Sequence, residues 1–323
     1  MLQDSYGFIW FGTDDGLNRF DGYNIKVYRH ILNDITSLSD NVIWSLFEDQ
    51  EGFLWIGTKT GKLNKYNPYK DRFENWFLPF NDTEEKSITF ITQDKNKLIW
   101  IGTYRNGLYR FDPLHNKFDN WQNLPGEPPI LSNNYVTSIL EDDFGNIWIA
   151  TFNGIDRYEP GNSEKPFSQI FNESEKTSDL SNIPVWYLNK SSFFGDLILA
   201  GTLNGLVSFN PVTLKYSKIK FPENPDSQFG NSVSSAAEEI FADEKIIWIA
   251  TYGGLVRNNF TTGKSQRFIQ SPKDYSGLLS NQVHDIIIDN SGVVWVATEN
   301  GINYYSPKRS KFNFGMSLNN NLL

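Results

Sequence analysis

The sequence predicts an all-β fold, a seven-bladed β-propeller with four antiparallel strands in each blade. A short apolar phrase recurs seven times, and each copy ends in a threonine: Thr13, Thr58, Thr103, Thr151, Thr202, Thr251 and Thr298. Successive threonines lie 45, 45, 48, 51, 49 and 47 residues apart. A repeat of this length, rich in β-branched and aromatic residues and punctuated by glycine, is typical of a propeller blade.

Each repeat contains four extended stretches, which we name strands A to D in chain order. In the second repeat they are separated by turn signals at residues 49–52, 59–61 and 67–68. Short apolar runs bounded by glycine, asparagine and proline read as strands joined by tight turns. In the fourth repeat the same plan predicts strands at residues 135–140, 146–151, 154–158 and 167–171.

Strand B is apolar almost throughout, which indicates that both of its faces are buried. Six copies carry a tryptophan at the same place, and the fifth carries a leucine: Trp10, Trp55, Trp100, Trp148, Leu199, Trp248 and Trp295. We expect these side chains to pack between neighbouring blades. The glycine or alanine two residues later is expected to let adjacent sheets approach closely.

Acidic residues recur in the turn between strands A and B, as in Asp49, Asp142 and Asp289. A carboxylate repeated at one turn position is explained by capping of that turn, without a catalytic role.

The two ends of the chain resemble parts of a strand A. Residues 317–323 match residues 37–43, the entry into strand A, and residues 1–4 match residues 46–49, its exit. We therefore expect one propeller over residues 1–315, with its first blade completed by the chain termini. The tail at 316–323 either closes the ring or begins a further repeat after a cut linker, and the two readings are compatible.

Composition excludes several classes of function. The 323 residues include no cysteine, so disulfides and thiolate metal sites are excluded, and no apolar run approaches the roughly 20 residues of a membrane span. The net charge of −9 argues against nucleic acid as the main partner. The three histidines lie in different repeats, so we expect no metal site and no cofactor. Residues 262–265 resemble the end of a phosphate-binding loop, but the upstream glycine is missing, and we expect a C–D hairpin turn there.

The repeat resembles the two-component regulator propeller repeat. The copies that carry the resemblance best are Glu141–Pro160 and Asp4–Phe20, in which an acidic turn is followed by Trp-Ile or Trp-Phe, a small residue and threonine. The fifth copy departs most, because residues 189–196 replace the acidic turn and Leu199 replaces the tryptophan.

This resemblance implies a function. Such propellers form the sensor region of Bacteroides-type hybrid two-component systems, which face the periplasm and respond to oligosaccharides by switching on polysaccharide-utilisation genes. The parent protein would be a histidine kinase, whereas this chain would carry no catalytic residues. Its partners would be an oligosaccharide, a second propeller and a β-sandwich domain of the same parent chain, with a possible homodimer through the parent.

The candidate ligand site lies where strand A enters and the B–C turns emerge, because loops there can vary without disturbing the blades. Aligning the strand A entries places Trp44, Thr89, Thr137, Trp186, Glu238 and His284 at one equivalent position. This position varies in character, whereas scaffold positions repeat. Aromatic faces beside amide and guanidinium groups suit a sugar. The predicted contacts are Trp44, Tyr104, Arg105, Tyr135, Trp186, Tyr252 and His284.

Two other functions remain open from the sequence. Aromatic side chains on this face also suit a propeller that binds a protein partner and has no sugar site of its own. A glycan lyase or hydrolase is the third possibility, and it would need convergent carboxylates or an Arg-Tyr-Glu cluster.

Overall fold

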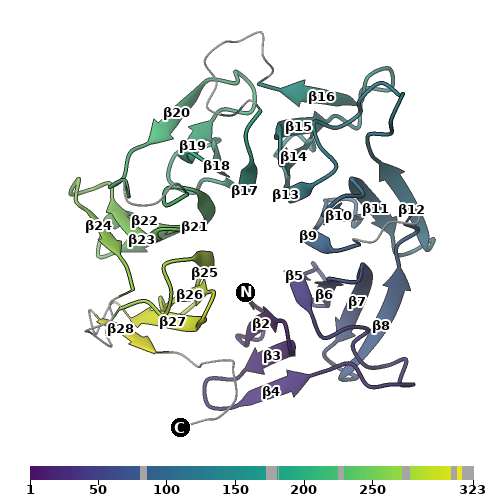
Figure 1. Ribbon diagram of the computed structural model, residues 1–323, viewed down its shortest axis with the longest axis horizontal. Coiled ribbons are helices and arrows are strands. Elements are labelled where there is room, and N and C mark those ends of the chain that lie inside the picture. Colours follow the sequence, from purple (N-terminus) through teal and green to yellow (C-terminus); the bar gives the residue numbers. More distant parts are fainter. Residues whose placement is uncertain are drawn as a thin grey trace. The chain divides into compact units, whose positions relative to one another are not determined.

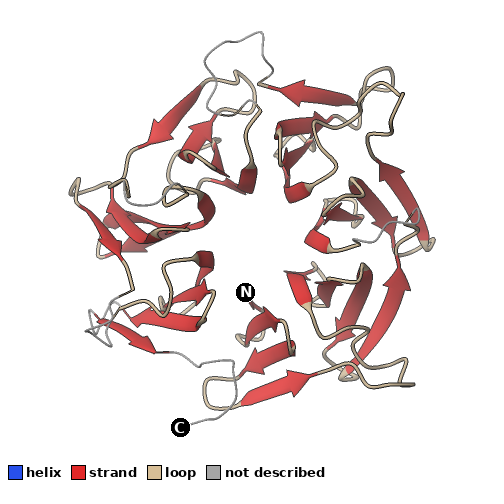
Figure 2. Ribbon diagram, in the orientation of Figure 1, coloured by secondary structure: helices blue, strands red, loops and turns tan. Residues whose placement is uncertain are grey.

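The fold is an all-β, seven-bladed β-propeller, as predicted, with four antiparallel strands in each blade. The computed structural model describes residues 1–80, 86–171, 180, 182–224, 229–270 and 277–306, and the backbone of residues 311–314. The chain forms two compact units, Met1–Val185 and Trp186–Leu323. Figures 1 and 2 show strands and loops in both, and the described residues include no helix. Within that described part, no helix has the length and apolar character required to cross a membrane.

The first unit contains four sheets. The strands are β1 (Leu2–Gln3), β2 (Ile9–Thr13), β3 (Gly16–Phe20) and β4 (Ile25–Tyr28) in the first blade; β5 (Ile43–Glu48), β6 (Leu54–Thr58), β7 (Lys62–Asn67) and β8 (Arg72–Phe77) in the second; β9 (Ile88–Gln93), β10 (Ile99–Thr103), β11 (Leu108–Asp112) and β12 (Lys117–Trp121) in the third; and β13 (Val136–Glu141), β14 (Ile147–Thr151), β15 (Gly154–Tyr158) and β16 (Phe167–Ile170) in the fourth.

The second unit contains three sheets, and its first strand begins at the unit boundary. The strands are β17 (Val185–Lys190), β18 (Ile198–Thr202), β19 (Gly205–Phe209) and β20 (Tyr216–Ile219) in the fifth blade; β21 (Val233–Phe241), β22 (Glu244–Thr251), β23 (Gly254–Asn259) and β24 (Ser265–Phe268) in the sixth; and β25 (Val283–Ile288), β26 (Val294–Thr298), β27 (Gly301–Ser306) and β28 (Lys311–Phe314) in the seventh. Residues 260–264 join β23 to β24, which confirms the hairpin turn predicted there.

The first blade has a short strand A. In β1, Leu2 pairs with Trp10 and Gln3 pairs with Ile9, so the chain start supplies part of this strand as predicted. The tail at 316–323 lies outside the described residues, and its role in completing the first blade stays a prediction.

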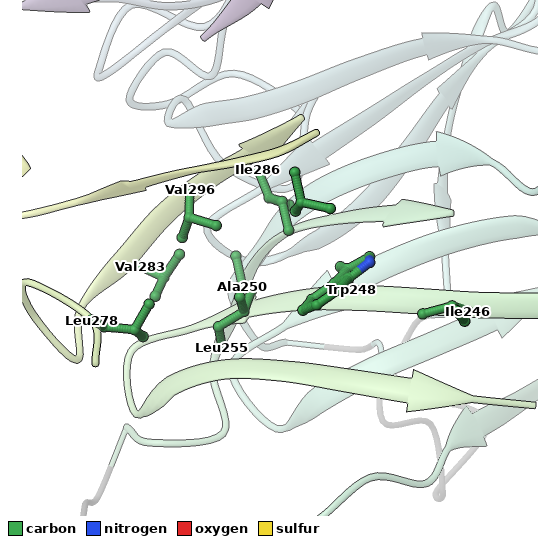
Figure 3. Close-up of a cluster of buried hydrophobic side chains, with 9 residues drawn as sticks. Ile246, Trp248, Ala250, Leu255, Leu278, Val283, Ile286 and Val296 are labelled. Atoms are coloured by element: carbon green, nitrogen blue, oxygen red, sulfur yellow. The ribbon is translucent and has the colours of Figure 1, made fainter. Parts of the chain in front are cut away.

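Five of the strand B residues lie in clusters shared by two consecutive blades, which confirms the prediction for Trp10, Trp55, Trp100, Leu199 and Trp248. Trp10 is 1% exposed and lies in one cluster with Ile43 and Leu54 of the second blade. In the second unit, Trp248 and Ala250 of the sixth blade share a cluster with Val283 and Ile286 of the seventh, and Figure 3 draws this cluster. Clusters of this kind join consecutive blades within each unit, so the blades share their cores.

Each of the six tryptophans donates its indole N–H to a carboxylate. The Nε1–Oδ2 distance is 2.8 Å for Trp55 with Asp49 and for Trp100 with Asp94. The other oxygen of Asp94 accepts the backbone N–H groups of Asn96 and Leu98. The acidic residues of the A–B turns therefore cap the turn and anchor the tryptophan together, which confirms their structural role.

The small residue after each tryptophan allows close contact between blades. A Cβ atom built on Gly57 would lie 2.3 Å from Ser45 Oγ and 2.4 Å from Ile88 Cγ2 of the third blade. Gly12 and Gly102 face Ile43 and Val136 in the same way. The predicted reason for these glycines is therefore confirmed.

We predict that Gly57→Ala destabilises the protein by about 1–3 kcal/mol, because overpacking forces neighbouring groups out of place. Urea unfolding would measure the loss. Gly161→Ala is the matched control, since nothing lies within 4 Å of a Cβ atom at that position. Equal stability of the two variants would contradict the close-packing argument.

We also predict that Asp94→Ala lowers the free energy of unfolding by at least about 3 kcal/mol, since each hydrogen bond to a charged group contributes about 1.5–3 kcal/mol. The variant leaves the buried indole N–H of Trp100 without its acceptor. The control is Asp196→Ala, an exposed aspartate between β17 and β18, which should change stability by less than about 0.5 kcal/mol. A small effect at position 94 would show that the carboxylate–indole bond is dispensable.

Candidate functional site

The candidate site begins with a β-bulge at the start of strand A. In five blades the strand A register skips one residue opposite strand B, and the residues skipped are Trp44, Thr89, Thr137, Ser234 and His284. A bulged residue is left out of the ladder and its side chain is re-aimed, so this position can vary without breaking the sheet.

This register corrects one predicted alignment. The sixth-blade residue equivalent to Trp44 is Ser234, not Glu238. Glu238 lies four residues further along β21, where its carboxylate accepts hydrogen bonds from Ser191 and Ser192 of the fifth blade. The alignment was wrong because β21 is nine residues long and extends beyond the shared strand length.

The small residues at the bulge position have a structural role. The hydroxyl of Thr89 donates to the carbonyl of Val136 at 2.5 Å, and that of Thr137 donates to the carbonyl of Val185. Ser234 makes the same bond to Val283 at 2.7 Å. These hydroxyls tie one blade to the next, whereas Trp44 and His284 occupy the position with rings.

Four aromatic rings from three consecutive blades meet in the first unit. The ring centroids of Tyr104 and Tyr135 are 4.6 Å apart, and the planes are inclined by 64°. Phe152 stacks on Tyr135 at 5.5 Å with an angle of 10°. Trp44 meets Tyr104 edge-on at 6.4 Å. The structure therefore brings together Trp44, Tyr104 and Tyr135, three of the predicted contacts.

A fourth predicted residue, Arg105, lies beside these rings. Its guanidinium carbon is 5.1 Å from the centroid of the Tyr104 ring, within the range of a cation–π contact. The side chain is exposed.

Four of these five side chains, all except Trp44, border an open hollow of about 590 Å³, which is within the usual range for a small-ligand site. Its lining residues are Tyr104, Arg105, Asn123, Ser132, Asn133, Asn134, Tyr135 and Phe152. The lining combines ring faces, amides, a hydroxyl and one guanidinium. Such a surface can stack on apolar faces of a ligand and direct hydrogen bonds to its polar groups.

Main-chain bonds place the aromatic residues. The backbone N–H of Tyr104 donates to the carbonyl of Ser87, and that of Phe152 donates to the carbonyl of Tyr135, each at 3.0 Å. The same kind of bond joins Tyr252 to Ser232 in the second unit. The first residue of each of these B–C turns is therefore held by its backbone, and its side chain is free to differ.

Two asparagines shape the polar wall of the hollow. The amide oxygen of Asn123 accepts the N–H groups of Ile130 and Leu131 at 2.9 and 3.0 Å. Asn134 bonds the backbone of Asn123 with both its amide oxygen and its amide nitrogen, at 2.7 and 3.0 Å. The connection between β12 and β13 is thus folded back on itself beside the rings.

Below that wall lies a buried carboxyl group. Asp156 on β15 is fully buried and accepts the backbone N–H of Ser132 at 2.7 Å and its hydroxyl at 2.6 Å. Burial raises the pKa of Asp156 to about 7, against the lowering effect of the Ser132 bonds. Asn64 and Asn303 occupy the equivalent position in the second and seventh blades and accept the equivalent backbone N–H groups.

We predict that Asp156→Asn raises stability at pH 8 and has little effect at pH 4, with an intermediate gain between the two. The folded-state pKa of about 7 lies above the unfolded value of 3.8. Stability from this group is therefore fully present below pH 3.8 and is lost as the pH rises through 7. The gain at pH 8 is at most about 4 kcal/mol, because one pKa unit corresponds to about 1.4 kcal/mol.

Thermal and urea unfolding from pH 4 to 9 would measure the difference between the two proteins. A difference that stays constant over this range would mean that Asp156 does not titrate there.

The other predicted residues lie in the second unit. Tyr252 and His284 contact each other, with ring centroids 6.1 Å apart and an angle of 69°. Burial raises the pKa of Tyr252, and the protein packed around His284 lowers the imidazole pKa, although this side chain is exposed at its surface. Trp186 is half-buried on β17.

Sequence reasoning missed several lining residues. Phe152 follows Thr151 as Tyr104 follows Thr103, so the repeat could have identified it. Asn123, Ser132 and Asn133 belong to the connection between β12 and β13 and had no comparable signal. Across the described residues, no group of three or more His, Asp and Glu side chains is arranged to hold a metal ion.

Comparison with known proteins finds one family model that matches three of the repeats. The model of the two-component regulator propeller matches residues 37–60, 130–153 and 277–300, which lie in the second, fourth and seventh repeats. Each match spans a strand A, its acidic turn and the strand B phrase. Three segments of the chain therefore match the two-component regulator propeller family, which confirms the resemblance noted in the sequence.

Three relatives illustrate the match. A segment of 37 residues is 54% identical to Histidine kinase P4 of Formosa agariphila, covering 12% of this chain and 3% of that protein. The extracellular domain of the putative hybrid two component system BT4673 from B. thetaiotaomicron superposes with a TM-score of 0.71 and 24% identity, over 94% of this chain and 37% of that one. The corresponding domain of BT3049 from the same organism gives a TM-score of 0.71 and 21% identity, over 94% and 39%.

At these identities the likeness to the solved structures shows a common fold. The chain spans less than two-fifths of each of these two structures and a small fraction of the kinase.

Proposed function

We propose that this chain is a ligand-sensing, extracytoplasmic part of a hybrid two-component sensor histidine kinase. Its ligand is an oligosaccharide derived from a glycan, and binding controls polysaccharide-utilisation genes. Two-component regulator repeats support this assignment, as does the fold shared with extracellular domains of such systems. In this proposal the kinase activity belongs to other parts of the parent protein. This domain would face the periplasm, and a second propeller and a β-sandwich domain of the same parent chain would be its partners.

The aromatic hollow of the first unit is the observation that carries the sugar assignment. Tyr104, Tyr135 and Phe152 offer ring faces, and Asn123 and Asn133 offer amides beside them. Sugar rings have apolar C–H faces that stack on aromatic rings, and hydroxyl groups that need directed donors and acceptors. A volume of about 590 Å³ accommodates a short oligosaccharide.

A binding screen tests this proposal. The 323-residue chain would be titrated with neutral and acidic oligosaccharides, first by thermal shift and then by calorimetry. We expect saturable binding of at least one oligosaccharide. Tyr104→Ala and Tyr135→Ala should each weaken it at least about tenfold, which corresponds to about 1.4 kcal/mol.

Tyr23→Ala is the matched control, because Tyr23 is 92% exposed and lies in the turn between β3 and β4. Its affinity should equal that of the unchanged protein. Unfolding temperatures of all three variants would separate a lost contact from a lost fold. Failure of every oligosaccharide to bind would favour the role of a structural or protein-binding propeller.

A further inference from the structure

We propose that Asp156 sets the direction of the hydrogen bond made by the hydroxyl group of Ser132 at the wall of the aromatic hollow. As a result, the hollow binds its oligosaccharide more tightly in weakly acidic than in basic solution. This inference rests on the proposed function and adds to it a residue that regulates the site.

Asp156 and Ser132 connect the core of the fourth blade to the hollow. Asp156 is fully buried on β15, whereas Ser132 is half-buried and lines the hollow. The hydroxyl oxygen of Ser132 lies 2.6 Å from Oδ1 of Asp156, and the backbone N–H of Ser132 donates to Oδ2 at 2.7 Å. Both hydrogen bonds of the carboxyl group are therefore made to one residue of the hollow wall.

The protonation state of Asp156 decides which oxygen donates, its own Oδ1 or the Oγ of Ser132. A carboxylate only accepts hydrogen bonds, so the Ser132 hydroxyl must donate to it. A neutral carboxyl group carries one proton and can donate it to Ser132 Oγ, while its other oxygen still accepts the backbone N–H. The hydroxyl proton of Ser132 is then released from Asp156 and can be donated to an acceptor atom of a ligand in the hollow.

The change of direction falls near neutral pH. Burial raises the pKa of Asp156 to about 7, against the lowering effect of the two Ser132 bonds. Below this pKa the neutral form predominates and Ser132 can donate to the ligand, and above it the carboxylate retains the hydroxyl proton. A ligand that accepts from Ser132 stabilises the neutral form, so its affinity decreases as the pH rises through the pKa.

The strands around Asp156 bring no charge against it. β15 pairs with β14 and β16, and neither of these strands contains an ionisable side chain. Arg157 follows Asp156 on β15, so its side chain points to the opposite face of the sheet, and it forms an ion pair with Glu159. Tyr158 shares the face of Asp156, where its ring packs 5.3 Å from that of Trp100.

The connection between β12 and β13 contributes Ser132 and two ionisable residues, the exposed Glu127 and Tyr135 of the ring cluster. Arg105 borders the hollow together with Ser132. Burial, which raises the pKa of Asp156, is the largest influence on this group.

The fold accepts an amide in place of Asp156, which provides a test variant. Asn64 and Asn303 occupy the equivalent position in the second and seventh blades, and each accepts the equivalent backbone N–H. An asparagine has a permanent N–H donor and does not titrate. At position 156 it should therefore act as the neutral acid does, at every pH.

Affinity measured from pH 5 to pH 9 tests the proposal. The 323-residue chain would be titrated by calorimetry with xylotetraose, mannotetraose, N-acetylchitotetraose and tetragalacturonate. The first three are uncharged and the fourth stays ionised over this range, so a change in affinity comes from the protein. We expect the oligosaccharide that binds to do so about three- to tenfold more weakly at pH 9 than at pH 5, as the net contribution of one hydrogen bond requires.

Two variants separate the roles of the two residues. Asp156→Asn should bind at pH 9 as tightly as the unchanged protein binds at pH 5, and its affinity should not vary with pH. Ser132→Ala lacks the hydroxyl group, so it should bind over the whole range as weakly as the unchanged protein does at pH 9. Unfolding temperatures of both variants at each pH would separate a lost hydrogen bond from a lost fold.

His115→Gln is the matched control. It removes a histidine, a residue type that titrates near neutral pH, from the exposed turn between β11 and β12. This variant should reproduce the pH profile of the unchanged protein.

The outcomes that contradict the inference differ in scope. An affinity that is constant from pH 5 to pH 9, or that changes with pH equally in Asp156→Asn, would remove the role of Asp156 and leave the oligosaccharide site in place. Absence of binding by all four oligosaccharides to the folded protein would remove the sugar site and its regulation together.

Discussion

The bond between a buried indole and a turn carboxylate is the interaction on which the blades depend. A tryptophan between two sheets excludes water, so its N–H needs an acceptor from the protein. Asp49 accepts from Trp55 and also caps the turn that leads into the same strand. Across the sheet, Lys65 lies 5.1 Å from the Trp55 ring and 3.8 Å from Asp49. One carboxylate thus links the turn and strands B and C. The sixth blade has a two-residue hairpin, and Glu239 reaches Trp248 from the strand itself.

The carboxylate–indole bonds lie at the A–B turns. The residues at the other end of these strands, where strand A begins and the B–C turn follows strand B, are therefore free to vary. The bulge at Trp44 and the B–C turn at Tyr104 are held by backbone geometry and main-chain bonds, so their side chains carry little of the stability. Where the bulged residue is small, as with Thr89, its hydroxyl joins the scaffold. Where it is aromatic, it enters the ring cluster. The same position therefore serves packing in one blade and recognition in another.

Features that repeat could be predicted, and those that depend on a single connection could not. The four strands of the fourth blade begin and end within one residue of their predicted limits, because the apolar period and the turn residues define them. Trp44, Tyr104, Arg105 and Tyr135 were found because they vary at repeating positions. Glu238 was misplaced because the sixth blade extends its A–B hairpin beyond the shared length. Asn123 was missed because its side chain differs from those at the matching positions of other connections. Its backbone bond to Asn134 recurs from His30 to Asn41 and from Gln270 to Asn281.

Asp156 belongs to the core of the fourth blade and bonds Ser132, which lines the hollow. Comparison with the second blade explains why a carboxyl group occupies this position. Asn64 accepts the backbone N–H of Ser39, but the buried Ser39 hydroxyl has no hydrogen-bond partner among the described residues. Ser132 offers the same two donors, and the two oxygens of Asp156 accept both. The fourth blade thus gains one hydrogen bond and accepts a buried acid whose charged form is unfavourable. Because Ser132 also lines the hollow, its two hydrogen bonds to Asp156 hold one wall of the site in place.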